Sequence, residues 1–330
     1  MKKLFLMLVV FFLGFLVVSP ALAELKIEQI SDIGDFNDYV VGPGKEYLFM
    51  DPGQSVARKI NITNRFQTEK TFKLELEDFR GGTDGVSPIE FMGLLAGPYS
   101  LKDYLKPETM EFTLKPGDRI TIPVVISIPE DAVPGGLYGS VIVTTEDTLK
   151  PGEAPKEEIA GQLPVISRIA VLYFIRVAGP VEEEGNLENF KTDRKIYWNT
   201  DKPVSFSYSF INNGNVYLNP FGRLVITNLY GATVDNIEVN SSYVLPSSTR
   251  NNIIDWGKKL GIGRYKATLT LNRGYLDKED IQDVQTIVFW ILPWKVIVGF
   301  IVGLFIFLVI VRAIRKWFRK NFKYTGGKKE

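Results

Sequence analysis

The sequence predicts an all-β protein made of two antiparallel β-sandwiches in tandem, followed by one C-terminal transmembrane α-helix. Two observations favour β structure. Short runs rich in β-branched and aromatic residues recur between Gly, Pro, Asn and Asp, and helical periodicity is hard to find between residues 24 and 290. The third observation is an uninterrupted apolar run at Val296–Val311, which is typical of a membrane-spanning helix.

The N-terminus, residues 1–23, predicts a secretory signal peptide. Two lysines precede an apolar run at Leu4–Val18, and the small-residue pattern Ala21–Ala23 follows it. Because Pro20 breaks the helix just before this pattern, we expect cleavage there, with Glu24 as the first mature residue. An uncleaved N-terminal anchor is the alternative.

Residues 24–180 predict the first sandwich. Apolar and polar side chains alternate in Lys70–Leu76, so one face of this strand lies in a core and the other in water. Six short strands separated by turn residues favour an immunoglobulin-like arrangement. A polar stretch with three prolines, Asp147–Pro164, predicts a long loop between the last two strands. The six predicted strands are Val56–Thr63, Lys70–Leu76, Glu111–Leu114, Ile120–Ile128, Gly139–Thr145 and Ile169–Val177.

Two Pro-Gly pairs predict tight turns that start strands of this sandwich. Pro52-Gly53 and Pro116-Gly117 suit the central positions of a type II turn, because Pro presets φ and Gly accepts a positive φ. Pro123 lies inside a predicted strand. Since proline cannot donate to a ladder, we expect that strand to lie at a sheet edge or to leave the sheet.

Residues 181–290 predict a second immunoglobulin-like sandwich. The stretch Gly179–Asn186, with a Gly-Pro pair and three acids, predicts the boundary before it. Serines alternate with larger apolar residues along Val204–Ile211, which predicts one solvated and one buried face. The other predicted strands are Gly222–Thr227, Ile237–Tyr243, Arg264–Leu271 and Gln285–Phe289.

Residues 291–312 predict the transmembrane helix. Its apolar run, Val296–Val311, spans about 24 Å, which is less than the ~30 Å hydrocarbon core of a bilayer. With Ile291–Lys295 added, the segment is long enough to cross the hydrocarbon core, if the Lys295 side chain extends towards the interface. We expect aromatic and basic residues to lie at the membrane interfaces. These are Trp290, Trp294, Lys295, Arg312, Arg315 and Lys316.

The tail, residues 313–330, is strongly basic and ends in a single acid, Glu330. Because basic residues beside a membrane helix stay on the cytoplasmic side, we expect the tail inside the cell and both sandwiches outside. This arrangement predicts a single-pass protein of a bacterial cell membrane, in contact with the lipid bilayer through its C-terminal helix.

Composition limits the chemistry open to this chain. Its 330 residues include no cysteine and no histidine, so disulfides, thiolate nucleophiles, imidazole bases and the commonest metal ligand are absent. The formal net charge of +1 gives no basic field for nucleic acid. We therefore expect no enzyme, no cofactor, no metal and no nucleic-acid partner.

Carboxylates are the main catalytic groups that remain. They cluster at Glu75, Glu77 and Asp78 on a predicted strand, and at Glu182–Glu184 in the predicted linker. We expect both groups to be solvated surface acids. Since a glycosidase needs only two carboxylates at a defined separation, a carboxylate-based hydrolase stays a distant alternative.

Five aromatic residues beside predicted loops are candidates for ligand binding, because sugar rings and peptides stack on such side chains. Core packing is the competing explanation for most of them. The five are Tyr99, Tyr104, Tyr138, Tyr197 and Trp198.

Three stretches carry a resemblance to a known family: "FMDPGQSVARKINITN" at residues 49–64, "GPYSLKDYLKPETMEFTLKPGDRITIPVVISIPEDAVPGGLYGSVIV" at residues 97–143 and "FINNGNVYLNPFGRLVITNLYG" at residues 210–231. With the membrane helix and basic tail, the chain resembles the WxL-interacting proteins of Gram-positive bacteria or a related set of bacterial two-sandwich membrane proteins. The resemblance implies a non-enzymatic surface protein that binds cell-wall peptidoglycan and partner surface proteins.

The sequence therefore favours a membrane-anchored binding or scaffold protein that engages cell-wall polymer or another surface protein. A chaperone-like or donor-strand-type assembly protein for surface subunits is the alternative. Edge strands with proline and long loops suit the addition of a strand from a partner.

Overall fold

The computed structural model describes residues 25–30, 36–146, 167–198, 202–257, 261–279 and 281–321. The predicted signal peptide, the predicted loop at Asp147–Pro164 and the tail beyond residue 321 lie outside these residues. The chain divides into two compact units. The first unit consists of Met1–Glu77, Ser100–Ala132 and Gly139–Phe174, and the second of Asp78–Tyr99, Val133–Tyr138 and Ile175–Glu330.

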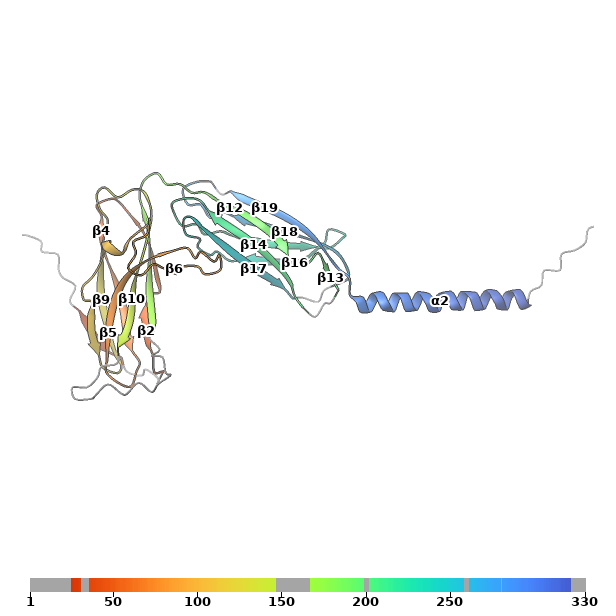
Figure 1. Cartoon of the computed structure of the whole chain (residues 1–330), viewed down its shortest axis with the longest axis horizontal. Coiled ribbons are helices and arrows are strands. Elements are labelled where there is room, and N and C mark those ends of the chain that lie inside the picture. The colour runs from red at the N-terminus through yellow and green to blue at the C-terminus, as the bar shows by residue number, and fades with distance from the viewer. Residues whose placement is uncertain are drawn as a thin grey trace, which may run out of the picture. The chain divides into compact units, whose positions relative to one another are not determined.

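The first sandwich consists of two sheets, as the sequence predicts (Figure 1). Its strands are β1 (Lys26–Gln29), β2 (Tyr39–Gly42), β3 (Lys45–Met50), β4 (Ser55–Asn64), β5 (Lys70–Arg80), β6 (Glu90–Phe91), β7 (Leu105–Pro107), β8 (Glu111–Leu114), β9 (Asp118–Ser127), β10 (Gly135–Glu146) and β11 (Arg168–Val177). One sheet has the order β1-β9-β4-β2, with β7 also paired to β9. The other has the order β3-β11-β10-β5-β6, with β8 paired to β5.

Both predicted Pro-Gly turns are present. Gly53 and Gly117 have φ of 77° and 83°, which glycine adopts without the steric cost that a Cβ brings. Each turn is closed by a backbone hydrogen bond, from Gln54 to Asp51 at 3.0 Å and from Asp118 to Lys115 at 3.1 Å. The turns start β4 and β9, which are neighbours in the same sheet.

The prediction that Pro123 marks an edge strand is wrong. β9 lies inside its sheet, with β4 on one side and both β1 and β7 on the other. β1 pairs with residues 118–121 of β9 and β7 with residues 124–126, so Pro123 lies between the parts of β9 that these two short strands cover. The Glu108 N–H, just after β7, donates to the Pro123 carbonyl at 3.0 Å, so the missing N–H leaves one ladder hydrogen bond at this position in place of two.

The second sandwich consists of a three-stranded sheet, β12-β14-β17, and a five-stranded sheet, β13-β19-β18-β15-β16 (Figure 1). Its strands are β12 (Gly185–Thr192), β13 (Ile196–Tyr197), β14 (Val204–Asn212), β15 (Phe221–Thr227), β16 (Thr233–Val239), β17 (Ser248–Trp256), β18 (Gly263–Asn272) and β19 (Gln282–Ile291). The gap between the end of β11 and the start of β12, residues 178–184, overlaps the predicted boundary at 179–186.

Along β14 the predicted alternation holds at every position. Val204, Phe206, Tyr208 and Phe210 are buried, and the serines between them are half-buried. The inward side chains meet Trp256 of β17 and the aromatic residues of the facing sheet in one hydrophobic core. Period-two patterning therefore placed this strand correctly.

One helix, α2 (Trp294–Asn321), follows β19 after two residues. Its most apolar window of 18 residues has a mean hydropathy of 2.9, and the segment Trp294–Lys320 is long and apolar enough to cross a membrane. It starts later and ends later than the predicted range of 291–312, because Ile291 still belongs to β19 and the basic residues up to Asn321 continue the helix. Trp294 and Lys295 lie in its first turn, and Arg312, Arg315 and Lys316 lie in its last part.

Candidate functional site

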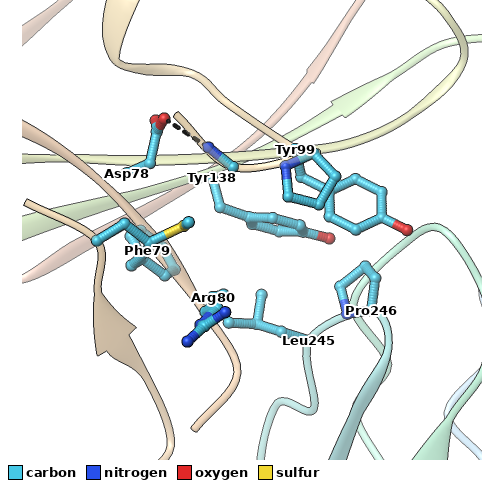
Figure 2. Close-up of a pocket in the computed structure, with 10 residues that line it drawn as sticks. Asp78, Phe79, Arg80, Tyr99, Tyr138, Leu245 and Pro246 are labelled. Carbon is cyan, nitrogen blue, oxygen red and sulfur yellow. Dashed lines mark hydrogen bonds between the residues drawn. The ribbon is translucent and has the colours of Figure 1, made fainter. Parts of the chain in front are cut away.

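Two of the aromatic candidates, Tyr99 and Tyr138, meet in the second unit beside a small pocket (Figure 2). The Tyr138 N–H donates to the Tyr99 carbonyl at 2.8 Å, and the two rings contact edge to face at 6.0 Å. Phe79 and Leu245 also line the pocket. Tyr138 is only 1% exposed, and this burial raises the pKa of its hydroxyl well above its ordinary value.

The pocket is too small for a ligand. It leaves a volume of about 10 Å³ that the centre of a water molecule can reach, which is about the space that one water needs. Tyr99 and Tyr138 therefore pack against each other and the pocket wall. Burial takes Tyr138 out of reach of a sugar or peptide, which corrects its prediction as a ligand-binding residue.

Tyr197 and Trp198 follow one another at β13 but differ in exposure. The Tyr197 ring packs edge-on against Phe289 at 6.0 Å, and its hydroxyl donates to the Asp193 carboxylate. It is 4% exposed, so it is a core residue and not a ligand contact. Trp198, by contrast, is 51% exposed.

Tyr104 is half-buried at the end of the short 3-10 helix η1 (Lys102–Tyr104) in the first unit. Its N–H donates to the Leu101 carbonyl at 2.9 Å, which closes that turn. The five predicted aromatics therefore do not form one site. Tyr138 and Tyr197 lie in cores, Tyr99 packs against Tyr138, Tyr104 lies in the first unit, and Trp198 is exposed.

Some of the acids predicted to be solvated are buried, and for these the prediction is wrong. Glu77, Asp78 and Glu183 are 9%, 1% and 1% exposed. In the part of the chain that the structure describes, no group of three or more acids is arranged to hold a metal ion.

Glu183 shows what a buried acid does in this fold. Its carboxylate accepts the N–H groups of Leu276, Asp277 and Lys278 at 2.8, 3.1 and 3.2 Å. The buried Arg176 guanidinium lies 3.0 Å from the same carboxylate. Both oxygens of the Glu183 carboxylate thus have partners within the protein. This side chain joins the start of the second sandwich to the loop at residues 276–278, and neither oxygen is left free for catalysis.

A different feature of the first unit is open to a partner. β9 pairs with residues 55–63 of β4, whereas β2 covers only residues 61–64. On the β2 side, residues 55–60 of β4 have no strand beside them in the described part of the chain. We call this segment the open edge of β4.

Hydrogen bonds at the two ends of β4 identify the groups that face the open edge. The Arg65 N–H donates to the Asp38 carbonyl at 3.0 Å on the β2 side. The Ile128 N–H donates to the Gln54 carbonyl at 2.9 Å on the β9 side. Because hydrogen-bonded and non-hydrogen-bonded pairs alternate in an antiparallel ladder, odd-numbered residues of β4 face the β2 side.

The N–H and C=O groups of Ser55, Ala57 and Lys59 therefore point towards the open edge. Pro123 lies opposite Lys59 and has no N–H, which agrees with a pair that is not hydrogen-bonded across β4 and β9. Among the described residues one side chain reaches these groups, since Arg58 Nη1 contacts the Ala57 carbonyl at 3.5 Å. That distance is at the limit of a hydrogen bond.

Polar groups lie between the sheets beside the open edge. Arg58 points inward and lies 3.7 Å from Glu46 of β3. The hydroxyl of Tyr173 on β11 is buried and has no hydrogen-bond partner among the described residues. Burial raises the pKa of Tyr173, Glu46 raises it further, and Arg58 opposes both. A strand added at the open edge would point alternate side chains between the sheets. A polar side chain at such a position would meet Arg58 as a donor, Glu46 as an acceptor and the Tyr173 hydroxyl as either.

Both outer strands of the three-stranded sheet, β12 and β17, have backbone groups occupied by contacts from other parts of the second unit. Beside β12, the Leu187 N–H donates to Asp283 at 3.0 Å and the Phe190 N–H to Gln285 at 3.2 Å. Gln285 also donates to the Leu187 carbonyl at 2.8 Å. On β17, the Asn251 N–H donates to the Gly85 carbonyl at 2.6 Å. These contacts occupy backbone groups that an added strand would need.

The chain matches no protein-family model, and no curated protein matches it in sequence. Solved structures resemble it distantly. The class 5 fimbriae chaperone CfaA is 11% identical, with a TM-score of 0.38 over 76% of this chain and 98% of that one. The chaperone CsuC, in complex with the tip subunit CsuE of Acinetobacter baumannii Csu pili, is 12% identical, with a TM-score of 0.35 over 78% and 99%. The CupB2 chaperone of Pseudomonas aeruginosa is 11% identical, with a TM-score of 0.32 over 75% and 98%.

TM-scores of 0.38 and below carry no argument about function. The sandwich fold is established by the strands of this chain themselves. The resemblance to WxL-interacting proteins and the expectation that the protein is not an enzyme stay predictions.

Proposed function

We propose that this protein is a membrane-anchored, chaperone-like binding protein that holds an extended segment of another surface protein by adding it as a strand to the open edge of β4. Addition of a strand takes its affinity from backbone hydrogen bonds and its specificity from alternate side chains. The proposed orientation, with the sandwiches outside the cell, rests on the basic residues at the end of α2.

One observation supports the proposal most directly. The N–H and C=O groups of Ser55, Ala57 and Lys59 alternate along one edge and have no strand beside them in the described part of the chain. A sheet edge of this kind is a template for pairing with another chain. The outer strands β12 and β17 of the second sandwich do not offer the same template, because Asp283, Gln285 and Gly85 occupy backbone groups on them.

The side chains at the open edge favour a particular partner. Lys59 is exposed, and the Arg58 side chain is 38% exposed. Positive charge beside a strand edge disfavours pairing with a basic segment or with a second copy of the same edge. We therefore expect the partner segment to be neutral or acidic.

The test is capture of solubilised surface proteins by the full chain in detergent, with Ala57→Pro as the decisive variant. Proline removes the central N–H of the open edge, and its ring blocks an approaching strand. Ala57→Val is the matched control, because it changes the side chain and keeps the N–H. We expect capture of a partner by the wild type and Ala57→Val, and at least tenfold less by Ala57→Pro.

If Ala57→Pro captures as much partner as the wild type, strand addition at this edge is wrong. Binding to cell-wall polymer is tested in parallel by sedimentation with washed sacculi. Pelleting of all three proteins without capture of a protein would replace the proposal with wall binding, as the resemblance to WxL-interacting proteins implies.

A further inference from the structure

The short strand β13 is joined to the start of the membrane helix. It pairs in parallel with β19, with Ile196 beside Trp290 and Tyr197 beside Ile291. Beyond the strand the contacts continue: the Leu292 N–H donates to the Tyr197 carbonyl at 2.9 Å, and the Trp294 N–H donates to the Trp198 carbonyl at 3.1 Å. The backbone of Trp198 is therefore bonded to the first residue of α2.

This contact sets the depth of Trp198 relative to a bilayer. Trp294 lies two residues before the apolar run of α2, which starts at Val296, and Trp317 lies near the other end. The two tryptophans are separated by about 35 Å along the helix, slightly more than the ~30 Å hydrocarbon core. Trp294 and Trp317 are thus spaced as residues of the two aromatic belts. Because the Trp198 carbonyl lies 3.1 Å from the Trp294 nitrogen, Trp198 lies at the same depth as the outer belt.

The side chains at this end of the sheet alternate between buried and exposed positions. Tyr197 and Ile291 are buried, whereas their neighbours Ile196, Trp198 and Trp290 are 39%, 51% and 42% exposed. Successive residues of a strand face opposite sides, so Ile196 and Trp290 lie on the solvent face of the sheet. In a soluble setting this would be an unusual concentration of exposed apolar surface.

We propose that Ile196, Trp198 and Trp290 form a second membrane contact, which lies in the headgroup layer of the bilayer beside the start of α2. The indole ring suits this layer, because its apolar body and its N–H donor match a boundary between hydrocarbon and water. The contact rests on the proposed membrane anchor and is continuous with it. It holds the second sandwich at the bilayer surface, in addition to the tether that the helix alone provides.

The experiment measures tryptophan quenching in the full chain reconstituted in phosphatidylcholine vesicles. One variant carries Trp290→Phe, Trp294→Phe and Trp317→Phe, which leaves Trp198 and the buried Trp256. Adding Trp198→Phe to this variant gives the background signal of Trp256. A third variant keeps Trp294 in place of Trp198 and reports whether the helix is inserted.

The quenchers are lipids brominated near the carbonyl end of the acyl chains and, separately, iodide in the water. We expect the brominated lipid to quench Trp198 and Trp294 to a similar extent, and iodide to quench Trp198 weakly. If Trp294 is quenched by the lipid while Trp198 is quenched only by iodide, the second contact is wrong and the anchor stands. If the lipid quenches neither, both the contact and the membrane anchor are wrong.

Discussion

The outer strand β12 of the second sandwich and the open edge of β4 in the first differ in what occupies their backbone groups. In the second, Asp283 and Gln285 of one sheet reach across to the backbone of β12 in the other and occupy its N–H groups. In the first, the polar residues at the open edge, Glu46 and Arg58, pair with each other. Arg58 makes only a long 3.5 Å contact with the edge itself. The difference indicates that an edge is closed by polar side chains supplied from the facing sheet, and that the first sandwich lacks them at β4.

The largest effect is expected from Glu183→Ala, which tests how strongly buried polar groups hold the second sandwich. The change removes one of the two acidic partners of the buried Arg176, which keeps Asp277, and removes the acceptor of three backbone N–H groups. We expect a loss of about 3–5 kcal/mol in the free energy of unfolding. All five tryptophans belong to the second unit, so urea denaturation followed by tryptophan fluorescence reports on it.

The control for this change is Glu184→Ala, at the adjacent exposed acid. Its expected effect is within about 0.5 kcal/mol. If Glu183→Ala is as stable as Glu184→Ala, the buried carboxylate contributes nothing to the stability of the second sandwich. The claim that buried polar groups hold this sandwich together would then be wrong.

Alkaline pH should also weaken the second sandwich. Burial raises the pKa of Tyr208 to about 12, whereas the unfolded tyrosine titrates near pH 10. The full stability is present below about pH 10 and is lost as the pH rises towards 12, because the unfolded state then releases a proton that the folded state keeps. The expected loss is about 2–3 kcal/mol. Because burial also raises the pKa of Tyr197 and Tyr265, Tyr208→Phe should reduce this dependence without abolishing it in denaturation curves from pH 8 to about 12; an unchanged slope would contradict the assignment to Tyr208.

Asp283→Ala should open the closed edge of β12. It leaves the Leu187 N–H without its acceptor and breaks the Arg273 pair at 2.7 Å. We expect about 1–3 kcal/mol lower stability, together with faster amide exchange at Leu187. In Asp283→Asn an acceptor oxygen remains, so a smaller loss is expected. If the alanine variant exchanges at Leu187 as slowly as the wild type, the edge is not closed by this side chain.

The smallest effect on stability is expected from Ala57→Pro. Its N–H faces the open edge, so no ladder bond is lost and the cost should stay below about 1 kcal/mol. Val56→Pro is the sharp contrast, because that N–H bonds to β9 and its loss should cost about 3 kcal/mol or more. Thermal unfolding followed by circular dichroism distinguishes the two. A larger cost at Ala57 than at Val56 would mean that the register is shifted by one residue.

Strands with clear period-two patterning could be predicted from the sequence, but β17 could not. β14 has alternating serine and aromatic residues, and its bounds were found within one residue. β17 carries Arg250, Asn251 and Asn252, whose types are not typical of strands, and it forms only because β14 pairs with it over its whole length. β2 and β3 were missed because Pro43 and Gly44 divide them into short pieces.

The state of a strand edge could not be predicted, because it depends on contacts between residues far apart in the sequence. Leu187 and Asp283 are 96 positions apart, and the donors to Glu183 lie 93 to 95 positions away. For the same reason Tyr138 and Tyr197 could not be told from exposed aromatics. Pattern alone identified the turns at Gly53 and Gly117, where the conformation is set by the local residues.

Residue-resolved hydrogen exchange of the full chain tests the central claim most directly. We predict fast exchange at Ser55, Ala57 and Lys59, and slow exchange at Val56, Arg58 and Leu187, whose N–H groups are bonded within the fold. A captured partner should protect the three open-edge amides together and leave Leu187 unchanged. Protection of Ala57 and Lys59 in the unbound protein, equal to that of Leu187, would contradict the open edge and with it the proposed mode of binding.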